Sequence, residues 1–164
     1  MAKIKIRKAR IEDASAIHAA HMDSIKTVCS KDHSPEEISA WGGRSFNHLR
    51  WKEAIELHSV WVVELDGAIE GYAHLQVSKG LSELEGYIEG LYLTSKCLGK
   101  KVGAALLDLM VEEARKGAVP TLRLHSTLTA HGFYLKAGFS DDAPMTTVTI
   151  SGQAIRCFPM SRAL

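Results

Sequence analysis

The sequence has few cysteines, few prolines and no long apolar run. Its three cysteines, Cys29, Cys97 and Cys157, are far apart and form no CxxC pair, so we expect neither a disulfide framework nor a zinc site. This usage is typical of a reducing compartment, and we expect a cytoplasmic protein. No stretch approaches the roughly 20 apolar residues of a membrane span. The opening MAKIKIRKARIED lacks the apolar run of a signal peptide, and Ala2 excludes the myristoylation pattern.

The sequence also has no excess of charge of one sign. The net charge is +1, so no broad electrostatic field favours nucleic acid or an anionic membrane, and we expect neither as a partner. With 164 residues and 46% hydrophobic residues, the chain suits a single domain over residues 1–164 with one sizeable core.

Alternating polarity predicts strands, and capping signals predict helices. Ser34 to Glu37 reads as a capping box with Pro35 at the first helical position, and Asp13 is a candidate N-cap for an earlier helix. Asp66-Gly67 between two β-type runs predicts a hairpin. The pattern predicts strands over 3–8, 60–65, 68–77, 84–93, 121–125, 145–150 and 154–160, and helices over 13–28, 34–43, 46–57, 100–116 and 129–137. This order implies an α/β fold whose sheet mixes parallel and antiparallel pairs.

The junction between the fourth strand and its following helix is the most informative segment. It reads YIEGLYLTSKCLGKKVG over residues 87–103, a strand that ends in a glycine-bearing loop opening into a helix. Backbone N–H groups of such a loop, with the positive end of the helix, form a site for phosphate. We predict pyrophosphate contacts from Leu98, Gly99, Lys100, Lys101, Val102, Gly103 and Ala104. The alternative is that the two glycines only shape a tight turn.

A second segment, GFYLKAGF over residues 132–139, follows about thirty residues later. Together the two segments resemble the GNAT superfamily of N-acetyltransferases, and the resemblance covers nearly the whole chain. It implies a mixed sheet flanked by helices on both faces and acetyl-CoA as co-substrate. Leu98 and Lys101 depart from the usual Arg/Gln and Gly of the family loop. We expect Lys101 to be tolerated there only with a negative φ and with its side chain pointing outward.

The resemblance also implies roles for particular residues. The backbone of Leu91, Tyr92 and Leu93 would bond the pantetheine arm, because the family strand splays from its neighbour here. Tyr134 matches the family tyrosine near the CoA sulfur and would protonate the departing thiolate. Thr129 stands where the family often has an asparagine that contacts CoA.

Glu89 is the best candidate for the base that takes the amine proton, with Glu85 as the second choice. Strict alternation would place Tyr87, Glu89 and Leu91 on one face of the strand, and Ile88, Gly90 and Tyr92 on the other. A solvated carboxylate without a catalytic role is the competing interpretation of Glu89.

The acceptor site is expected from roughly Met22 to Arg50 and Met145 to Cys157, by the family pattern. The first part holds His33, Trp41, Arg44, Phe46 and His48, and its SPEEISAW string resembles a group of small bacterial GNAT proteins. We interpret Trp41 as a packing anchor.

The spacing of His18 and His21 invites a metal interpretation, but no further ligand has clear spacing, so we expect no metal. His21 falls on the apolar stripe of its helix, and we expect it to be partly buried with its hydrogen bonds satisfied. Either histidine could instead line the acceptor pocket.

Two functions remain open at this stage. The first is an N-acetyltransferase that moves acetyl from acetyl-CoA to a small or peptide amine, by direct transfer in a ternary complex. The second is an acyl-CoA-binding regulatory module with little activity, which the departures at Leu98 and Lys101 would favour. The apolar C-terminus could support a homodimer, although core packing explains it equally well.

Overall fold

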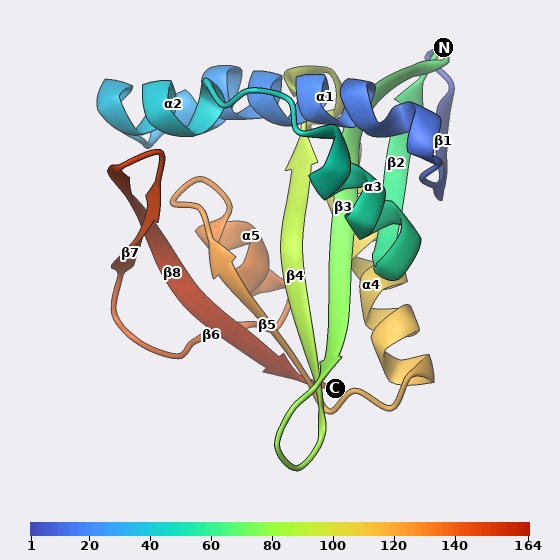
Figure 1. Ribbon diagram of the computed structural model, residues 1–164, viewed down its shortest axis with the longest axis vertical. Helices are drawn as coiled ribbons and strands as arrows, with labels where there is room; N and C mark the ends of the chain where they lie inside the picture. The colour runs from blue at the N-terminus through green and yellow to red at the C-terminus, as the bar shows by residue number, and fades with distance from the viewer.

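The sheet organises the molecule. The computed structural model describes residues 1–164 and contains eight strands in the order β1-β2-β3-β4-β5-β8-β6, with β7 paired to β8 (Figure 1). Every neighbouring pair is antiparallel except β4 and β5, so the expected mixture of pair types is confirmed. The strands are β1 (Ile4–Lys8), β2 (Ser59–Leu65), β3 (Ala68–Lys79), β4 (Leu84–Leu93), β5 (Thr121–Ser126), β6 (Ser140–Asp141), β7 (Thr146–Ile150) and β8 (Gln153–Ala163).

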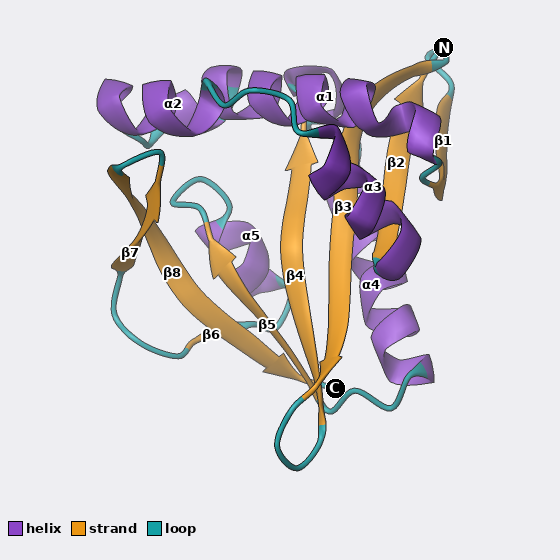
Figure 2. Ribbon diagram, in the orientation of Figure 1, coloured by secondary structure: helices purple, strands orange, loops and turns teal.

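Five α-helices cover the sheet (Figure 2). Their starts follow from local sequence: the Ser34 hydroxyl accepts from the Glu37 N–H at 3.2 Å, and the Asn47 side chain accepts from the Arg50 N–H at 3.1 Å. The helices are α1 (Ala14–Thr27), α2 (Pro35–Gly42), α3 (His48–Leu57), α4 (Val102–Lys116) and α5 (His131–Lys136), with short 3-10 turns at Ile11–Asp13, Cys29–Lys31 and Ser95–Cys97.

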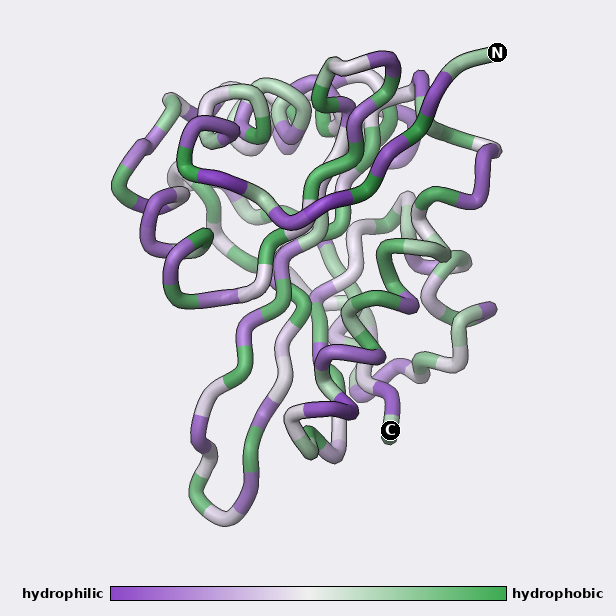
Figure 3. Tube along the Cα trace, turned by 90° about the vertical axis from the view of Figure 1, so that its right-hand side faces the viewer, coloured by the Kyte–Doolittle hydropathy of each residue, from purple (hydrophilic) through white to green (hydrophobic).

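Helices pack on both faces of the sheet, as the side view in Figure 3 shows. On one face α4 and α5 bury the largest apolar cluster, which includes Leu106, Met110 and Tyr134. On the other face α1 and α3 cover the sheet through Ile17 and Trp51, and α1, α2 and β8 share a third cluster. The α/β fold with flanking helices is therefore confirmed.

The strands β4 and β5 separate near their middle. They pair in parallel only from Gly86 to Ile88 on β4, against Leu122 to Leu124 on β5. Beyond Ile88 the two strands diverge, which Figure 1 shows as the gap between their arrowheads. The last residues of β4 therefore have no strand partner on that side, and their backbone polar groups are available to other partners.

Two local expectations were wrong. Asp13 does precede α1, but its side chain caps no helical N–H group; it binds the Arg7 guanidinium at 2.7 and 3.0 Å and the Arg10 N–H instead. The partly buried ion pair with a strand residue outcompetes the local cap. The short strand β6 was not expected, because two exposed residues carry no periodicity and pair only through β8.

Candidate active site

A cavity of about 210 Å³ lies where β4 and β5 diverge. It extends from the loop before α4 to the open face of the sheet, and most of its wall is apolar. Its lining comes from the end of α1, β4, the start of α4, β5 and α5: Ser24, Val28, Cys29, Ile88, Glu89, Gly90, Leu91, Tyr92, Leu93, Leu98, Gly103, Leu124, His125, Thr127, Thr129, Ala130, Phe133 and Tyr134. The cavity thus brings together both sequence segments that carried the functional prediction.

One end of the cavity is bordered by free backbone donors. The N–H groups of residues 99 to 104 donate to no acceptor in the chain, whereas the Ala105 N–H bonds the Lys101 carbonyl at 3.2 Å. These groups lie at the N-terminus of α4, whose first turn holds no acidic residue that would neutralise the helix dipole. A run of unpaired N–H groups at a helix N-terminus is a binding site for an anion.

The conformation of Lys101 differs from the expectation. Its φ is +61°, so the condition of a negative φ was wrong. The loop turns through left-handed conformations at Gly99, with φ +73°, and again at Lys101, which directly precedes α4. A lysine in this conformation costs about 1 kcal/mol relative to glycine. Both Lys100 and Lys101 are exposed, so their cations remain available to an anion at the loop.

A β-bulge at Glu89 changes the faces of β4. Ile88 pairs with Leu75 and Gly90 pairs with His74, so Glu89 has no partner on β3. The strict alternation expected for this strand was therefore wrong, because a bulge inserts one residue into one strand only.

The side chains on either side of the bulge show the change of face. Ile88 and Leu91 pack toward α4, whereas Tyr92 packs toward α1. The bulge leaves the Glu89 side chain at the mouth of the cavity.

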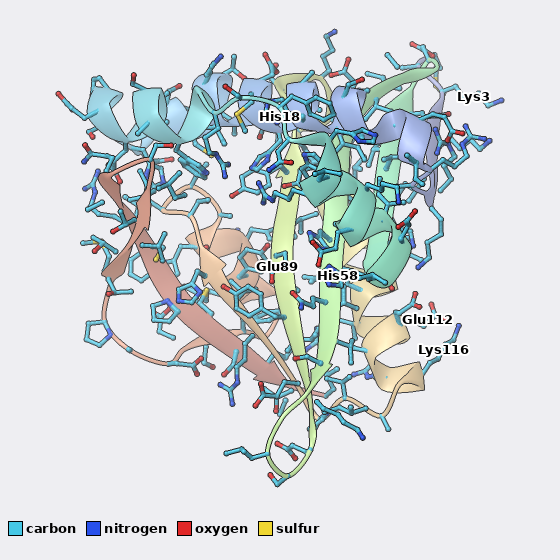
Figure 4. All side chains as sticks on the ribbon, in the orientation of Figure 1. Lys3, His18, His58, Glu89, Glu112 and Lys116 are labelled. Atoms are coloured by element: carbon cyan, nitrogen blue, oxygen red, sulfur yellow. The ribbon has the colours of Figure 1, made fainter.

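Glu89 is surrounded by groups that control its ionisation. The surrounding walls partly desolvate its carboxylate, which raises its pKa above the usual 4.5, while the nearby charges of His58, Arg50 and His125 oppose the shift. Figure 4 shows Glu89 on β4 in the same part of the sheet as His58, which follows α3. An elevated glutamate pKa is the property expected of a base near neutral pH.

A histidine pair accompanies this carboxylate. His58 Nδ1 lies 2.9 Å from His74 Nε2, and the two rings stack with centroids 5.1 Å apart. Burial lowers the pKa of His74 to about 3, and the adjacent His58 adds to the shift, so His74 is neutral near pH 7. One of the two facing ring nitrogens therefore donates a hydrogen bond to the other.

The phenol of Tyr134 lies on the opposite wall of the cavity. Its side chain is 5% exposed and packs edge-on against Phe133 and Phe139. Burial raises its pKa above the usual 10, so the phenol keeps its proton. Thr129 also lines the cavity, and its buried hydroxyl makes no hydrogen bond within the chain.

Comparison with known proteins decides the family. The model of the acetyltransferase (GNAT) domain matches residues 29–164. The chain belongs to the GNAT family of acetyltransferases. The predicted resemblance is confirmed, and so is the expectation of an acyltransferase whose co-substrate is acetyl-CoA.

Individual GNAT proteins resemble the chain along nearly its whole length. The uncharacterized N-acetyltransferase YafP of Escherichia coli K12 is 25% identical over 157 residues, which cover 96% of this chain and 89% of that protein. A GCN5-related N-acetyltransferase from Rhodopseudomonas palustris superposes with a TM-score of 0.84 at 24% identity, covering 98% of this chain and 95% of that chain. The PaiA N-acetyltransferase from Thermoplasma acidophilum, solved with coenzyme A, gives 0.77 at 22% identity, covering 99% of both chains.

The GNAT cavity includes most of the predicted site residues but not all. Glu89, the β4 residues 91 to 93, Leu98, Gly103, Thr129 and Tyr134 line it. Residues 99 to 101 and Ala104 are exposed beside it, and the Val102 side chain is buried in the core, so these positions offer backbone N–H groups rather than side chains. Glu85 is exposed on the β3–β4 hairpin and lies outside the cavity wall.

Other residues of this GNAT site were missed by sequence reasoning. Cys29, His125 and Phe133 line the cavity, yet they lie on three different elements and share no motif. His58 and His74 are brought together by the pairing of β2 with β3, since His58 directly precedes β2 and His74 pairs with Val60. The one available signal was Phe133, which precedes Tyr134 in the second segment.

The predicted acceptor segment of the GNAT fold has mixed roles. His33 and Trp41 are buried, with His33 bonded to Glu37 at 3.1 Å, and the interpretation of Trp41 as a packing anchor is confirmed by its place in the third cluster. Arg44 is half-buried, and Phe46 is exposed beside the His18 ring.

The expectation of a partly buried His21 with satisfied hydrogen bonds was wrong. The side chain is 4% exposed, and neither ring nitrogen has a hydrogen-bond partner. Burial holds its pKa well below 6.5, so the ring is neutral.

The structure has neither a metal-ligand cluster nor a helix that could span a membrane. No group of three or more His, Cys, Asp or Glu side chains is arranged to hold a metal ion. None of the helices is both long enough and apolar enough to span a membrane.

Proposed function

We propose that residues 1–164 act as one N-acetyltransferase domain that moves acetyl from acetyl-CoA directly to a primary amine within a ternary complex. The observation that carries this proposal is the run of free N–H groups at residues 99 to 104, placed at one end of the cavity that contains Glu89 and Tyr134. An anion-binding loop and an acid–base pair in one cavity are what transfer from a pyrophosphate-bearing thioester requires.

The loop residues bind the pyrophosphate. Free N–H groups from Gly99 to Ala104 donate to the phosphate oxygens, and the exposed ammonium groups of Lys100 and Lys101 add attraction. The Leu98 N–H is already bonded to the Ser95 carbonyl at 3.3 Å, so Leu98 contributes only the side chain that lines the cavity. The replacement of the family glycine by Lys101 leaves this binding possible because the donors belong to the backbone.

The unpaired edge of β4 holds the pantetheine arm. Leu91, Tyr92 and Leu93 line the cavity beyond the point where β5 departs, so their backbone groups can bond the amides of the arm. Thr129, whose buried hydroxyl is unpartnered, faces the same space and supplies one further hydrogen bond.

The transfer step uses one base and one acid. Glu89 accepts a proton from the ammonium group, and the neutral amine nitrogen attacks the thioester carbonyl carbon. We assign stabilisation of the carbonyl oxygen to the backbone N–H of Leu91, beside the bulge. The carbon–sulfur bond then breaks, and Tyr134 donates its proton to the leaving thiolate. The amide nitrogen and Glu89 each release one proton to solvent, and the Tyr134 phenolate takes one back.

The cysteines support direct transfer over an acyl-enzyme route. Cys29 lines the cavity, but burial raises its pKa to about 11, and burial also raises the pKa values of Cys97 and Cys157. A thiol with a raised pKa has little of the nucleophilic thiolate at neutral pH. A covalent acetyl-cysteine is therefore disfavoured.

Initial-rate kinetics with a panel of primary amines tests the proposal. We expect thiol release that needs both substrates, intersecting double-reciprocal lines, and unchanged line patterns in Cys29→Ala. Gly103→Val should weaken acetyl-CoA binding, because its side chain would enter the cavity beside Phe133, whereas Gly117→Ala at the other end of α4 should not. Parallel lines would contradict the ternary complex. Acetyl-CoA binding without turnover of any amine would favour the regulatory module instead.

A further inference from the structure

Two arginines lie against Trp41 and Trp51, beside the cavity, and have no anionic partner. Arg44 precedes α3 and Arg50 lies in its first turn, and neither forms a salt bridge in the chain. The Arg44 Nε donates to the Trp41 carbonyl at 2.9 Å, and the Arg50 guanidinium lies 5.4 Å from the centre of the Trp51 ring. Burial lowers the pKa of Arg44, and the charge of Arg50 lowers it further. Arg44 is half-buried and Arg50 is exposed, and two uncompensated cations that repel each other at such a site favour an anion.

A buried histidine beneath these arginines also lacks a partner. The His21 ring is 4.3 Å from Tyr92, 5.3 Å from Tyr72 and 6.4 Å from Trp51 by ring centroids. Both of its nitrogens are buried without a hydrogen bond. A buried polar group left unpaired costs about 1–3 kcal/mol, so its presence in a folded protein calls for an explanation such as a ligand.

The aromatic residues around His21 lie next to the proposed base, Glu89. The Tyr72 hydroxyl would lie 2.6 Å from any Cβ at Gly90, so the phenol sits directly over the residue next to Glu89. The charge of Arg50 acts both on Glu89 and on His21. Arg50 lies over Trp51, which packs edge-on against Tyr72, and Arg44 bonds the Trp41 carbonyl. The arginines therefore lie on the Tyr72 side of Glu89, next to the cavity but outside its wall.

We infer that the acceptor amine carries a carboxylate, which Arg44 and Arg50 bind while its amine points toward Glu89. The inference rests on the proposed N-acetyltransferase function and names the substrate class of the same site. Guanidinium groups bind carboxylates through paired, charge-assisted hydrogen bonds. An amine without an anionic group would leave the charges of the two arginines unpaired, so the site also selects against such amines.

Matched pairs of amines test this directly. L-Methionine and L-phenylalanine are compared with L-methioninamide and L-phenylalaninamide, which keep the amine and side chain but lack the carboxylate. Thiol release at saturating acetyl-CoA gives kcat/KM, corrected for the neutral fraction of each amine. We expect the acids to exceed the amides at least tenfold. In Arg44→Gln and Arg50→Gln the ratio of acid to amide should fall toward one, while the exposed Arg115→Gln on α4 should keep the wild-type ratio.

Equal or better use of the amides, or a ratio unchanged in both arginine variants, would overturn the inference while leaving the acetyltransferase function intact. If acetyl-CoA binds but no amine of any kind is acetylated, the proposed function fails instead. Calorimetric titration of the same acids and amides into the CoA-loaded protein then decides the anion site. If the acids bind and this binding is lost in Arg44→Gln and Arg50→Gln, with both variants folded by circular dichroism, the anion site is supported. If acids and amides bind equally well, the anion site is overturned.

Discussion

Tyr134 shows how burial prepares a single residue for one role. Its ring is held by Phe133 and Phe139, and its hydroxyl belongs to the cavity wall. Because burial raises its pKa, the phenol is a proton donor at neutral pH rather than a phenolate. The packing and the chemistry can therefore be separated by removing the hydroxyl alone.

Tyr134→Phe should keep the fold and lose the proton. We expect kcat to fall about 100-fold, within the usual range for a general acid, with little change in the acetyl-CoA dissociation constant. Steady-state kinetics and calorimetry measure the two quantities. Tyr87→Phe is the matched control, since that hydroxyl bonds His125 and has no role in the proposed transfer. An unchanged kcat in Tyr134→Phe would remove the residue from the mechanism.

Glu89 makes a prediction about pH. A base must be ionised to act, so activity falls as the pH drops through its pKa, and the raised pKa places this acidic limb above pH 4.5. Glu89→Gln should lower kcat/KM about 100-fold and abolish the limb. The exposed Glu85→Gln, on the same strand, should keep both. A profile of kcat/KM against pH for the three proteins is the measurement, and a limb that survives in Glu89→Gln would assign the base elsewhere.

At the scale of elements, Glu37 joins three parts of the chain. It completes the cap of α2, accepts from the Arg156 backbone at 2.8 Å and side chain at 2.7 Å, and contacts His33, whose other nitrogen accepts from the Leu128 N–H. Burial alone would raise its pKa, but the hydrogen bonds from Arg156 and Ser34 hold it well below 4.5. One carboxylate therefore ties α2 to β8 and to the loop before α5.

Glu37→Gln should destabilise the protein by about 2–3 kcal/mol, because the charged hydrogen bonds of Arg156 are lost. Since the folded pKa is depressed, the stability from Glu37 is present above pH 4.5 and is lost as the pH falls below it. The variant should therefore lose less stability than wild type below pH 4.5. Urea unfolding on both sides of that pH measures this, with the exposed Glu36→Gln as control. Parallel pH dependence in wild type and Glu37→Gln would refute the assignment.

The loop before α4 makes a second prediction at this scale. Lys101 holds a left-handed conformation that glycine adopts without strain, so Lys101→Gly should stabilise the fold by about 1 kcal/mol. Lys101→Ala removes the same charge but keeps the strain, and it should give no such gain. Urea unfolding of both variants is the test; equal stabilities would mean that the charge, and not the backbone, determines the effect.

At the scale of the whole molecule, the sequence predicted what local periodicity and capping encode. The capping box at Ser34, the hairpin at Asp66-Gly67 and the limits of β4 all follow from neighbouring residues, and the structure has them. The pairing of the glycine loop with the segment at Tyr134 came from family resemblance. Both segments line one cavity.

What the sequence could not predict depends on contacts between distant elements. The bulge at Glu89 arises from the register of β3 against β4, which alternation along one strand does not reveal. The burial of His21 without a partner needs α1 to be placed on the sheet, and the pairing of His58 with His74 needs the register of β2 against β3. These are features of the candidate site rather than of the framework.

Calorimetric titration with acetyl-CoA and with S-acetylpantetheine, which lacks the pyrophosphate and nucleotide, tests the central claim most directly. The account predicts saturable binding of acetyl-CoA and a loss of at least 100-fold in affinity for the truncated thioester, since the free N–H groups of residues 99 to 104 then have no phosphate to bind. Equal affinity for the two, or no binding of acetyl-CoA at millimolar concentration, would mean that the glycine loop is only a turn.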